Sequence, residues 1–319
     1  MTEYFASREP ASLGFKDILY SKADGVARIT INRPESFNCY TTFTLQELTA
    51  AIDDASSDDA VGVIVLTGAG DKAFCTGGDV KEYANVYTKR PHDYFKYMGL
   101  FAKYIESILR SGKVTIARLN GIAVGGGNET QLACDLAVMA DDTYLGQVGT
   151  SVGSVACGGA TQWLSVTVGD RRAREMLFLN SKIPAAKALE WGLVNRVVPR
   201  AKLDEEVATL CQQLLDKFPE CTRYTKQQVN YWKELSWHAT VGHARDWLST
   251  HFTTLEPYEG MQAFVEKRKV DFKGLRARAT DGQSSEFLWG PYEHQCPSCG
   301  AKGIPSSFRF CGCCGAGLG

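Results

Sequence analysis

The sequence predicts an α/β domain that is followed by a helical region and a small cysteine-rich module. Short apolar or alternating runs recur between helical patterns over about 200 residues, which is typical of strands and helices packed in layers. Two glycine-rich loops each run from a predicted strand into a predicted helix. Five cysteines close to the C-terminus set the last residues apart from this domain.

The composition narrows the class of protein. The 319 residues are 44% hydrophobic and 22% charged, which is enough apolar material for a sizeable core. The 35 basic and 36 acidic residues give a net charge of −1, which argues against nucleic acid or an anionic membrane as a partner held by bulk charge. No apolar run approaches the roughly 18 residues of a membrane span, and the start lacks a signal-peptide pattern. We therefore expect a cytoplasmic protein.

The first elements follow from short patterns. The first 22 residues show no strong periodicity and are interpreted as an arm or an edge segment. Apolar and polar residues alternate over Val26–Ile31, which predicts a strand, and the compact apolar run Val61–Leu66 predicts a buried one. Between them lies a helix with Thr41 or Thr42 as its N-cap. Its apolar residues recur at helical spacing: Leu45, Leu48, Ile52 and Ala55.

The same patterns continue through the rest of the domain. The expected elements are, in chain order, a helix at Asp93–Arg110, strands at Lys113–Leu119 and Ala133–Ala140, helices at Arg171–Leu179 and Ala185–Trp191, a short strand at Leu193–Val198, and a helical region from about Leu203 to Phe272. The first of these helices carries its apolar residues on one stripe: Tyr94, Tyr97, Met98, Phe101, Ile105 and Ile108.

The C-terminal cysteines have the spacing CxxC–x11–CxxC. Two such turns can aim four thiolates at one ion, which suits Zn²⁺ at a closed structural site and resembles a zinc ribbon. The expected ligands are Cys296, Cys299, Cys311 and Cys314, with Cys313 as a competitor for the last position. The near-neutral charge of this segment gives no support for nucleic acid, so we expect the ribbon to cap the structure or to dock a protein partner.

The two glycine-rich loops are candidates for an oxyanion hole. Residues 73–82 read AFCTGGDVKE, and residues 120–129 read NGIAVGGGNE. Glycine lets main-chain N–H groups come close to a ligand oxygen, and the start of a helix adds favourable partial charge. Two converging N–H groups can stabilise a developing enolate by several kcal/mol in the transition state.

With both loops present, the chain resembles the crotonase (enoyl-CoA hydratase/isomerase) superfamily from about Phe15 to Phe272. The matching stretches are INRPESFN, AFCTGGDVKE, NGIAVGGGNE, ACDLAVMA, LGQVG, GGATQWL, AKALEWGLVNRVV and GMQAFVEKRKVDF. The resemblance implies a spiral of ββα units and a C-terminal helical region for trimerisation, so we expect a homotrimer or a dimer of trimers. It also implies acyl-CoA thioesters as substrates, with CoA as part of the substrate and no redox cofactor.

The resemblance also implies roles for single residues. Cys75 and Gly126 would supply the two backbone N–H groups of the oxyanion hole. Glu129 matches the family's first catalytic carboxylate, which would hold the attacking water as a general base. Residues Cys75–Val80 would form the adenine-binding loop, and Lys267 would meet a CoA phosphate. Further acyl-CoA contacts are expected from Thr76, Gly77, Gly78, Val80 and Gly125.

One position departs from the hydratases of this family. Their second carboxylate stands in a GQPE-type stretch, whereas residues 146–149 read GQVG, and Gly149 leaves room for a ring or a second water. The patterns GSxAxGGAT and CTGGxxKEYAxxY are most similar to ring-opening enzymes of the 6-oxocyclohex-1-ene-1-carbonyl-CoA hydrolase type. The match is partial, because Asp79 stands where asparagine is expected and Thr150-Ser151 stands where Pro-Lys is expected.

Proton transfers beyond Glu129 need another group. Asp79, Tyr83, Tyr87 and His92 are candidates because they lie close to the first loop in the sequence. The tyrosines can instead form the wall of the pocket or pack in the core, and His92 can be a surface residue.

These observations predict four segments: a spiral core over 1–200, a helical region over 201–275, a linker over 276–291 and a zinc ribbon over 292–319. The expected activity is addition of water to a cyclic oxo-enoyl-CoA, with ring opening by carbon–carbon hydrolysis through an enolate. Two alternatives stay open. One is an enoyl- or dienoyl-CoA hydratase that uses Glu129 alone, and the other is a non-catalytic acyl-CoA-binding scaffold whose ribbon docks a partner.

Overall fold

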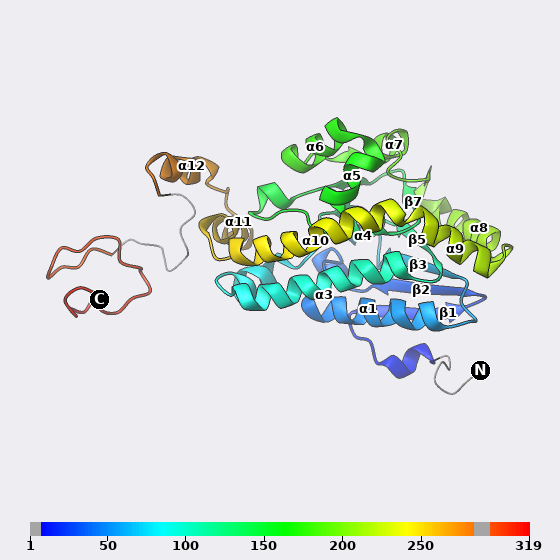
Figure 1. Cartoon of the computed structure of the whole chain (residues 1–319), viewed down its shortest axis with the longest axis horizontal. Coiled ribbons are helices and arrows are strands. Elements are labelled where there is room, and N and C mark those ends of the chain that lie inside the picture. The colour runs from blue at the N-terminus through cyan, green and yellow to red at the C-terminus, as the bar shows by residue number, and fades with distance from the viewer. Residues whose placement is uncertain (1–7, 284–293) are drawn as a thin grey trace.

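The computed structural model describes residues 8–283 and 294–319 (Figure 1). The second half of the predicted linker and the first two residues of the predicted ribbon lie outside the described residues. Within them, strands and helices alternate up to Val198 and only helices follow from Leu203 to Thr280. The architecture therefore changes from mixed to all-helical between Val198 and Leu203.

A large sheet forms the base of the fold, with the strand order β1-β2-β3-β5-β7-β10. Its strands are β1 (Ile18–Ala23), β2 (Val26–Ile31), β3 (Val63–Gly68), β5 (Val114–Leu119), β7 (Leu136–Ala140) and β10 (Arg196–Val198). The first two strands form an antiparallel hairpin, and the other neighbours run parallel. Parallel neighbours need crossover connections, which the helices supply.

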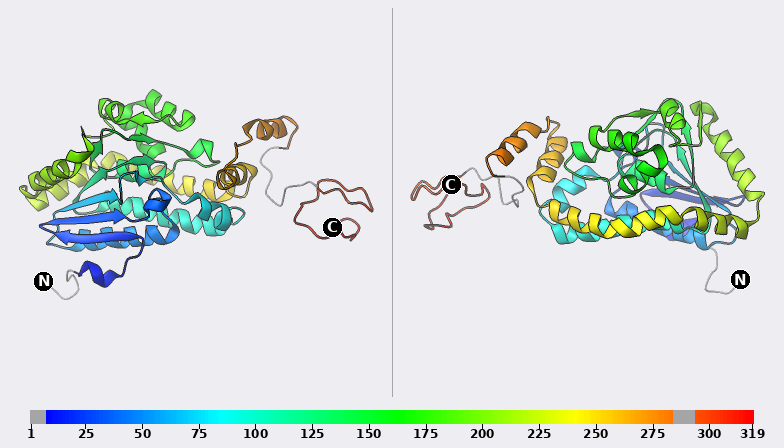
Figure 2. Two further views of the ribbon diagram at one scale, coloured as in Figure 1. Left: turned by 180° about the vertical axis from the view of Figure 1, so that it is seen from behind. Right: turned by 45° about the horizontal axis from the view of Figure 1, so that its top comes forward.

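Three long helices cover one face of this sheet. The helices α1 (Thr42–Ser57), α3 (Pro91–Arg110) and α10 (Tyr231–His251) lie side by side in that order (Figures 1 and 2). The other face is covered by α8 (Leu203–Leu215). Strand β3 is buried along its whole length because its residues alternate between these two packing layers.

A second, smaller sheet carries the loops that matter for function. It has the order β4-β6-β8-β9, with β4 (Ala73–Cys75), β6 (Ile122–Val124), β8 (Tyr144–Gly146) and β9 (Ile183–Pro184). Short helices follow its strands: α2 (Val80–Glu82), the π-helical turn η4 (Tyr83–Tyr87), α4 (Gly126–Ala133), α5 (Ala160–Val168), α6 (Asp170–Leu179) and α7 (Ala185–Glu190). The last three form the upper layer in Figure 1.

Most predicted elements are confirmed. Strand β2 occupies its predicted residues, and the Thr41 side chain accepts a hydrogen bond from the N–H of Thr44 as the N-cap of α1. The whole predicted stripe of α3 is buried. The prediction of a strand from Ala133 is wrong at its start, because Ala133 ends helix α4 and β7 begins only at Leu136.

The N-terminal segment contains a strand that the sequence interpretation missed. Strand β1 pairs with β2 along its length, and the two are joined by Asp24 and Gly25, which both have positive φ angles. An Asp-Gly pair between two strand-like runs is a strong hairpin signal, because both residues tolerate that backbone conformation.

The C-terminal part is helical, as predicted. After α8 and before α10 comes α9 (Pro219–Val229), and α11 (Leu255–Glu266) and α12 (Phe272–Thr280) follow α10. Helix α12 occupies residues 276–280, which were expected to begin the linker. None of the helices in the described ranges is long and apolar enough to cross a membrane.

Candidate active site

The two glycine-rich loops meet at one edge of the small sheet. Strands β4 and β6 pair in parallel, so the loops that follow them leave from the same edge. The loops are in contact, because a Cβ atom on Gly77 would lie 2.8 Å from the backbone nitrogen of Gly126. A cavity of about 540 Å³ opens beside this contact. Most of the predicted site residues line it: Thr76, Gly77, Gly78, Asp79, Val80, Tyr83, Gly125, Gly126, Glu129 and Gly149.

Four predicted residues do not line this cavity. Cys75 is fully buried in β4, and Tyr87 is buried with its hydroxyl bonded to that of Thr42. His92 is exposed in the first turn of α3, as its surface alternative predicted. Lys267 is exposed at the C-terminal end of α11, the helix whose Met261 and Phe264 do line the cavity.

The backbone geometry favours Gly78 over Cys75 as one of the two N–H donors. The N–H of Tyr40 donates to the carbonyl of Gly77, and the N–H of Asp79 donates to the carbonyl of Tyr40, both at 2.9 Å. This parallel bridge uses the carbonyl of Gly77 and the N–H of Asp79, which are the neighbours of Gly78. The N–H of Gly78 itself therefore points away from Tyr40. Gly78 lines the cavity and Cys75 does not, so the expected position of the donor moves three residues along the chain.

Gly126, the expected second donor, also lines the cavity. Gly126 is the first residue of α4, so its N–H has no acceptor within the helix. Both donor positions require glycine. A Cβ on Gly78 would lie 1.6 Å from the hydroxyl oxygen of Tyr83, and a Cβ on Gly126 would lie 1.7 Å from that of Tyr40. These tyrosines fill the space that a side chain at either glycine would need.

Glu129 is the buried carboxylate of the cavity. Its side chain is held at the start of α5, where Oε1 accepts hydrogen bonds from the N–H groups of Gly158 at 2.6 Å and Ala160 at 3.2 Å. The residue is 4% exposed, and this burial raises the pKa of its carboxyl to about 7, against the opposing effect of those two bonds and of the backbone N–H of Cys157. A carboxyl group with this pKa can both take and return a proton near neutral pH.

At residue 149 the cavity is lined by a glycine and not by a carboxylate side chain. A Cβ at this position would be 3.0 Å from the carbonyl oxygen of Ser154. The cavity is instead rich in aromatic side chains. The hydroxyls of Tyr83 and Tyr97 are 2.6 Å apart, and Tyr40 stacks on Phe101.

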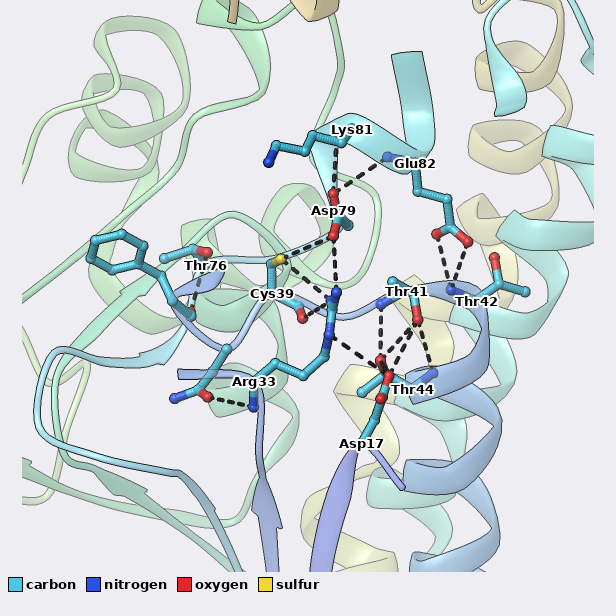
Figure 3. Close-up of polar contacts among 12 residues, drawn as sticks. Asp17, Arg33, Cys39, Thr41, Thr42, Thr44, Thr76, Asp79, Lys81 and Glu82 are labelled. Atoms are coloured by element: carbon cyan, nitrogen blue, oxygen red, sulfur yellow. Dashed lines mark hydrogen bonds and ion pairs between the residues drawn. The ribbon is translucent and has the colours of Figure 1, made fainter. Parts of the chain in front are cut away.

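The carboxylate of Asp79 is engaged in the loop itself (Figure 3). It caps α2 by accepting from the N–H groups of Lys81 and Glu82, and it forms an ion pair with Arg33 at 3.2 Å. Burial alone would raise the pKa of Asp79, but the bonds from Glu82 and Arg33 outweigh it and lower the pKa. These contacts favour a structural role over the acid–base role that was considered for Asp79.

The sequence interpretation missed Tyr40 and Arg33. Both lie between β2 and α1, in a stretch for which the helix cap at Thr41 or Thr42 was predicted. Arg33 is part of the matched motif INRPESFN, and a cation directly after a strand could have indicated a partner for Asp79. Tyr40 had no such signal, because its contact with Gly78 joins residues that are far apart in the chain.

A second site lies in the C-terminal module. The sulfur atoms of Cys296, Cys299, Cys311 and Cys314 all lie within 4.8 Å of one another. The Sγ atoms of Cys296 and Cys314 are 3.5 Å apart, and those of Cys299 and Cys311 are 3.7 Å apart. Cys313 is exposed and stands outside this group, which favours Cys314 as the fourth member.

The comparisons with known proteins agree with this geometry. The sequence pattern of the enoyl-CoA hydratase/isomerase family matches residues 21–276. The 6-oxocyclohex-1-ene-1-carbonyl-CoA hydrolase of Geobacter metallireducens is 33% identical, over 82% of this chain and 84% of its own length.

Solved structures show the same fold. An enoyl-CoA hydratase from Mycobacterium avium subsp. paratuberculosis has a TM-score of 0.73 at 26% identity, over 81% of this chain and 98% of its own. An enoyl-CoA hydratase from Bacillus anthracis has a TM-score of 0.65 at 30% identity, over 81% of this chain and 100% of its own. The chain therefore has the predicted crotonase fold and belongs to the enoyl-CoA hydratase/isomerase family, whose members are enzymes that act on CoA thioesters.

Proposed function

We propose that the chain adds water to a cyclic oxo-enoyl-CoA and then opens the ring by carbon–carbon hydrolysis. The observation that carries this proposal is the pairing of one buried carboxylate, Glu129, with two glycine N–H groups in a cavity where Gly149 replaces a second carboxylate. The similarity to a 6-oxocyclohex-1-ene-1-carbonyl-CoA hydrolase supports the same substrate class.

The first step is hydration. The deprotonated Glu129 takes a proton from a water molecule as the water oxygen bonds to the β-carbon of the thioester. Negative charge then develops on the thioester oxygen, where the N–H groups of Gly78 and Gly126 can stabilise it. The proton returns from Glu129 to the α-carbon, so the carboxylate is restored.

The second step uses the same oxyanion site. Water attacks the ring ketone, and cleavage of the adjacent carbon–carbon bond expels a thioester enolate. Because both steps place charge on the same thioester oxygen, one pair of N–H donors serves both. Thr76, Gly77, Val80, Gly125 and the space beside Gly149 are the proposed contacts for the acyl-CoA chain and the ring. Lys267 stays a proposed contact for a CoA phosphate.

The test is a panel of cyclic oxo-enoyl-CoA and linear enoyl-CoA thioesters, with mass spectrometry of the products. Ring opening adds two waters to the substrate, and hydration alone adds one. The Glu129→Ala variant should lose turnover and keep CoA binding. A wild-type protein that binds CoA but converts no thioester would contradict the proposal and favour the acyl-CoA-binding scaffold.

Hydration alone is the second candidate. The solved structures that share the fold at 26–30% identity include enoyl-CoA hydratases, which supports an enzyme that stops after the first step with Glu129 as its single acid–base group. A product that carries one added water and an intact ring would establish this activity in place of ring opening.

We also propose that Cys296, Cys299, Cys311 and Cys314 hold a structural zinc ion. Four sulfurs around Zn²⁺ at about 2.3 Å lie about 3.8 Å from each other. The two measured sulfur pairs are close to that spacing. The module has a small apolar core around Ile304, so metal binding would supply much of its folding free energy. Metal analysis of the purified chain should find one zinc per chain.

We propose assembly into a homotrimer or a dimer of trimers. Large apolar side chains are exposed on α9 and α10, among them Val229, Tyr231, Trp232 and Leu235. An exposed patch of this kind indicates a protein contact. Light scattering on the purified chain would give the mass of the assembly, and a monomer at micromolar concentration would contradict the proposal.

A further inference from the structure

Two phenol hydroxyls lie beside one of the backbone donors and have no part in the steps above. Tyr83 and Tyr97 both line the cavity, and their hydroxyl oxygens are 2.6 Å apart. Tyr83 comes from the π-helical turn η4 that follows the first loop, and Tyr97 comes from α3. The hydroxyl of Tyr83 touches Gly78, since a Cβ there would lie 1.6 Å from it.

The positions of these hydroxyls are fixed by packing. The ring of Tyr83 meets the rings of Tyr97, Tyr94 and Phe252 edge-on, with centroid distances of 5.3, 6.0 and 6.0 Å. Tyr94 in turn stacks on Phe252 at 3.6 Å. Donors that are held in place before the substrate binds stabilise a developing charge without further reorganisation.

The pair offers one spare donor. Each phenol has one O–H group, and the bond between them consumes one of the two. The other O–H remains for a ligand. Burial raises the pKa of both hydroxyls, so both keep their protons at neutral pH. The pair is therefore a neutral donor that lies directly beside Gly78.

We propose that the Tyr83–Tyr97 hydroxyl pair binds the ring ketone oxygen of a β-keto thioester. This inference rests on the proposed function and narrows its substrate class. In a β-keto thioester a single carbon separates the two carbonyl groups, so their oxygens lie next to each other. With the thioester oxygen at the N–H groups of Gly78 and Gly126, the neighbouring ketone oxygen can reach the hydroxyl of Tyr83, which touches Gly78. A plain enoyl thioester has no atom for this position.

The pair acts in the ring-opening step. The oxygen of a water molecule bonds to the ketone carbon, one of its protons passes to Glu129, and the ketone oxygen becomes an alkoxide held by the spare O–H. The carbonyl then re-forms as part of a carboxylic acid while the bond to the α-carbon breaks. Its electron pair moves into the thioester enolate at Gly78 and Gly126, and Glu129 returns the proton to the α-carbon. One water is consumed, and the reaction needs no oxidant or reductant.

The test separates hydration from ring opening in variants that remove one hydroxyl each. With a cyclic β-keto enoyl-CoA as substrate, Tyr83→Phe should lower the rate of ring opening about 100-fold, the effect of removing one oxyanion donor. Tyr97→Phe should lower it less, because Tyr83 keeps its O–H. In both variants the intermediate with one added water should accumulate. Tyr104→Phe is the control, since its hydroxyl is buried in the same aromatic region but does not line the cavity.

The possible outcomes are distinct. Accumulation of the hydrated, unopened intermediate in Tyr83→Phe but not in Tyr104→Phe supports the inference. Equal loss of hydration and ring opening would show a merely structural role and overturn it, as would unchanged rates of both. A wild-type enzyme that opens no ring would overturn the proposed function itself, and with it this inference, so the two failures are distinguishable.

Discussion

Replacing Glu129 by glutamine is expected to abolish turnover and, at the same time, to stabilise the fold above neutral pH. Burial holds the pKa of this carboxyl at about 7, against a usual value of 4.5. An acid whose pKa is raised by folding is neutral in both states at low pH. As the pH rises past 4.5, the unfolded chain loses the proton first, so the free energy of unfolding falls until the pH passes 7.

The size of the effect follows from the shift. A difference of about 2.5 pKa units corresponds to about 3 kcal/mol, of which about 2–3 kcal/mol is lost between pH 5 and pH 8. Glutamine has nearly the same shape, and its carbonyl oxygen can still accept the hydrogen bonds from Gly158 and Ala160. Because glutamine does not titrate, Glu129→Gln should exceed the wild type in stability by that amount at pH 8 and by much less at pH 5.

The assay is equilibrium unfolding in urea at both pH values, with turnover measured in parallel. Glu175→Gln is the control, because Glu175 is an exposed glutamate on α6 and its replacement should leave the comparison unchanged. A stability difference between wild type and Glu129→Gln that is the same at pH 5 and pH 8 would refute the reasoning. A gain in stability without loss of turnover would refute the catalytic role.

Three further changes test the site and the cysteine module. Gly78→Ala would place a Cβ 1.6 Å from the Tyr83 hydroxyl, so the donor geometry should break and kcat should fall about 100-fold or more, while circular dichroism shows the fold retained. Asp79→Asn keeps a capping side chain but loses the ion pair with Arg33, so the free energy of unfolding should fall by about 1–2 kcal/mol. The value of kcat should change only a few-fold. A loss of kcat above 100-fold would instead indicate proton transfer by Asp79. Cys314→Ser should lower the zinc content from one per chain towards zero, whereas Cys313→Ser should leave it unchanged; the reverse result would exchange the two ligands.

The sequence predicted the elements whose signals are local. The stripe of α3 and the N-cap of α1 follow from periodicity and from one residue type, and both are confirmed. The start of β7 was harder to predict, because apolar residues occur both at the end of helix α4 and in the strand that follows it. Strand β1 was missed although Asp24 and Gly25 carried a hairpin signal, because the interpretation of that segment relied on periodicity alone.

The same difference between local and long-range signals applies to the candidate site. The resemblance picked out both loops and Glu129, because they are contiguous motifs. It assigned one donor to Cys75, whereas the backbone geometry favours Gly78. The direction of an N–H group depends on the bridge to Tyr40, which lies 38 positions before Gly78 in the chain. The engagement of Asp79 by Arg33 likewise depends on a contact between distant segments.

The hydrogen bonds that end on Oε1 of Glu129 have a stereochemical consequence for the proposed hydration. The N–H groups of Gly158 and Ala160 both donate to Oε1, and an oxygen that accepts two donors is a poor place for a proton. We therefore expect the neutral acid to carry its proton on Oε2. In the proposed reaction one atom would then take the proton from water and deliver it to the α-carbon, so both would approach the substrate from the same side. Hydration should be a syn addition, and deuterium from D2O should appear on the face of the double bond that also receives the hydroxyl group.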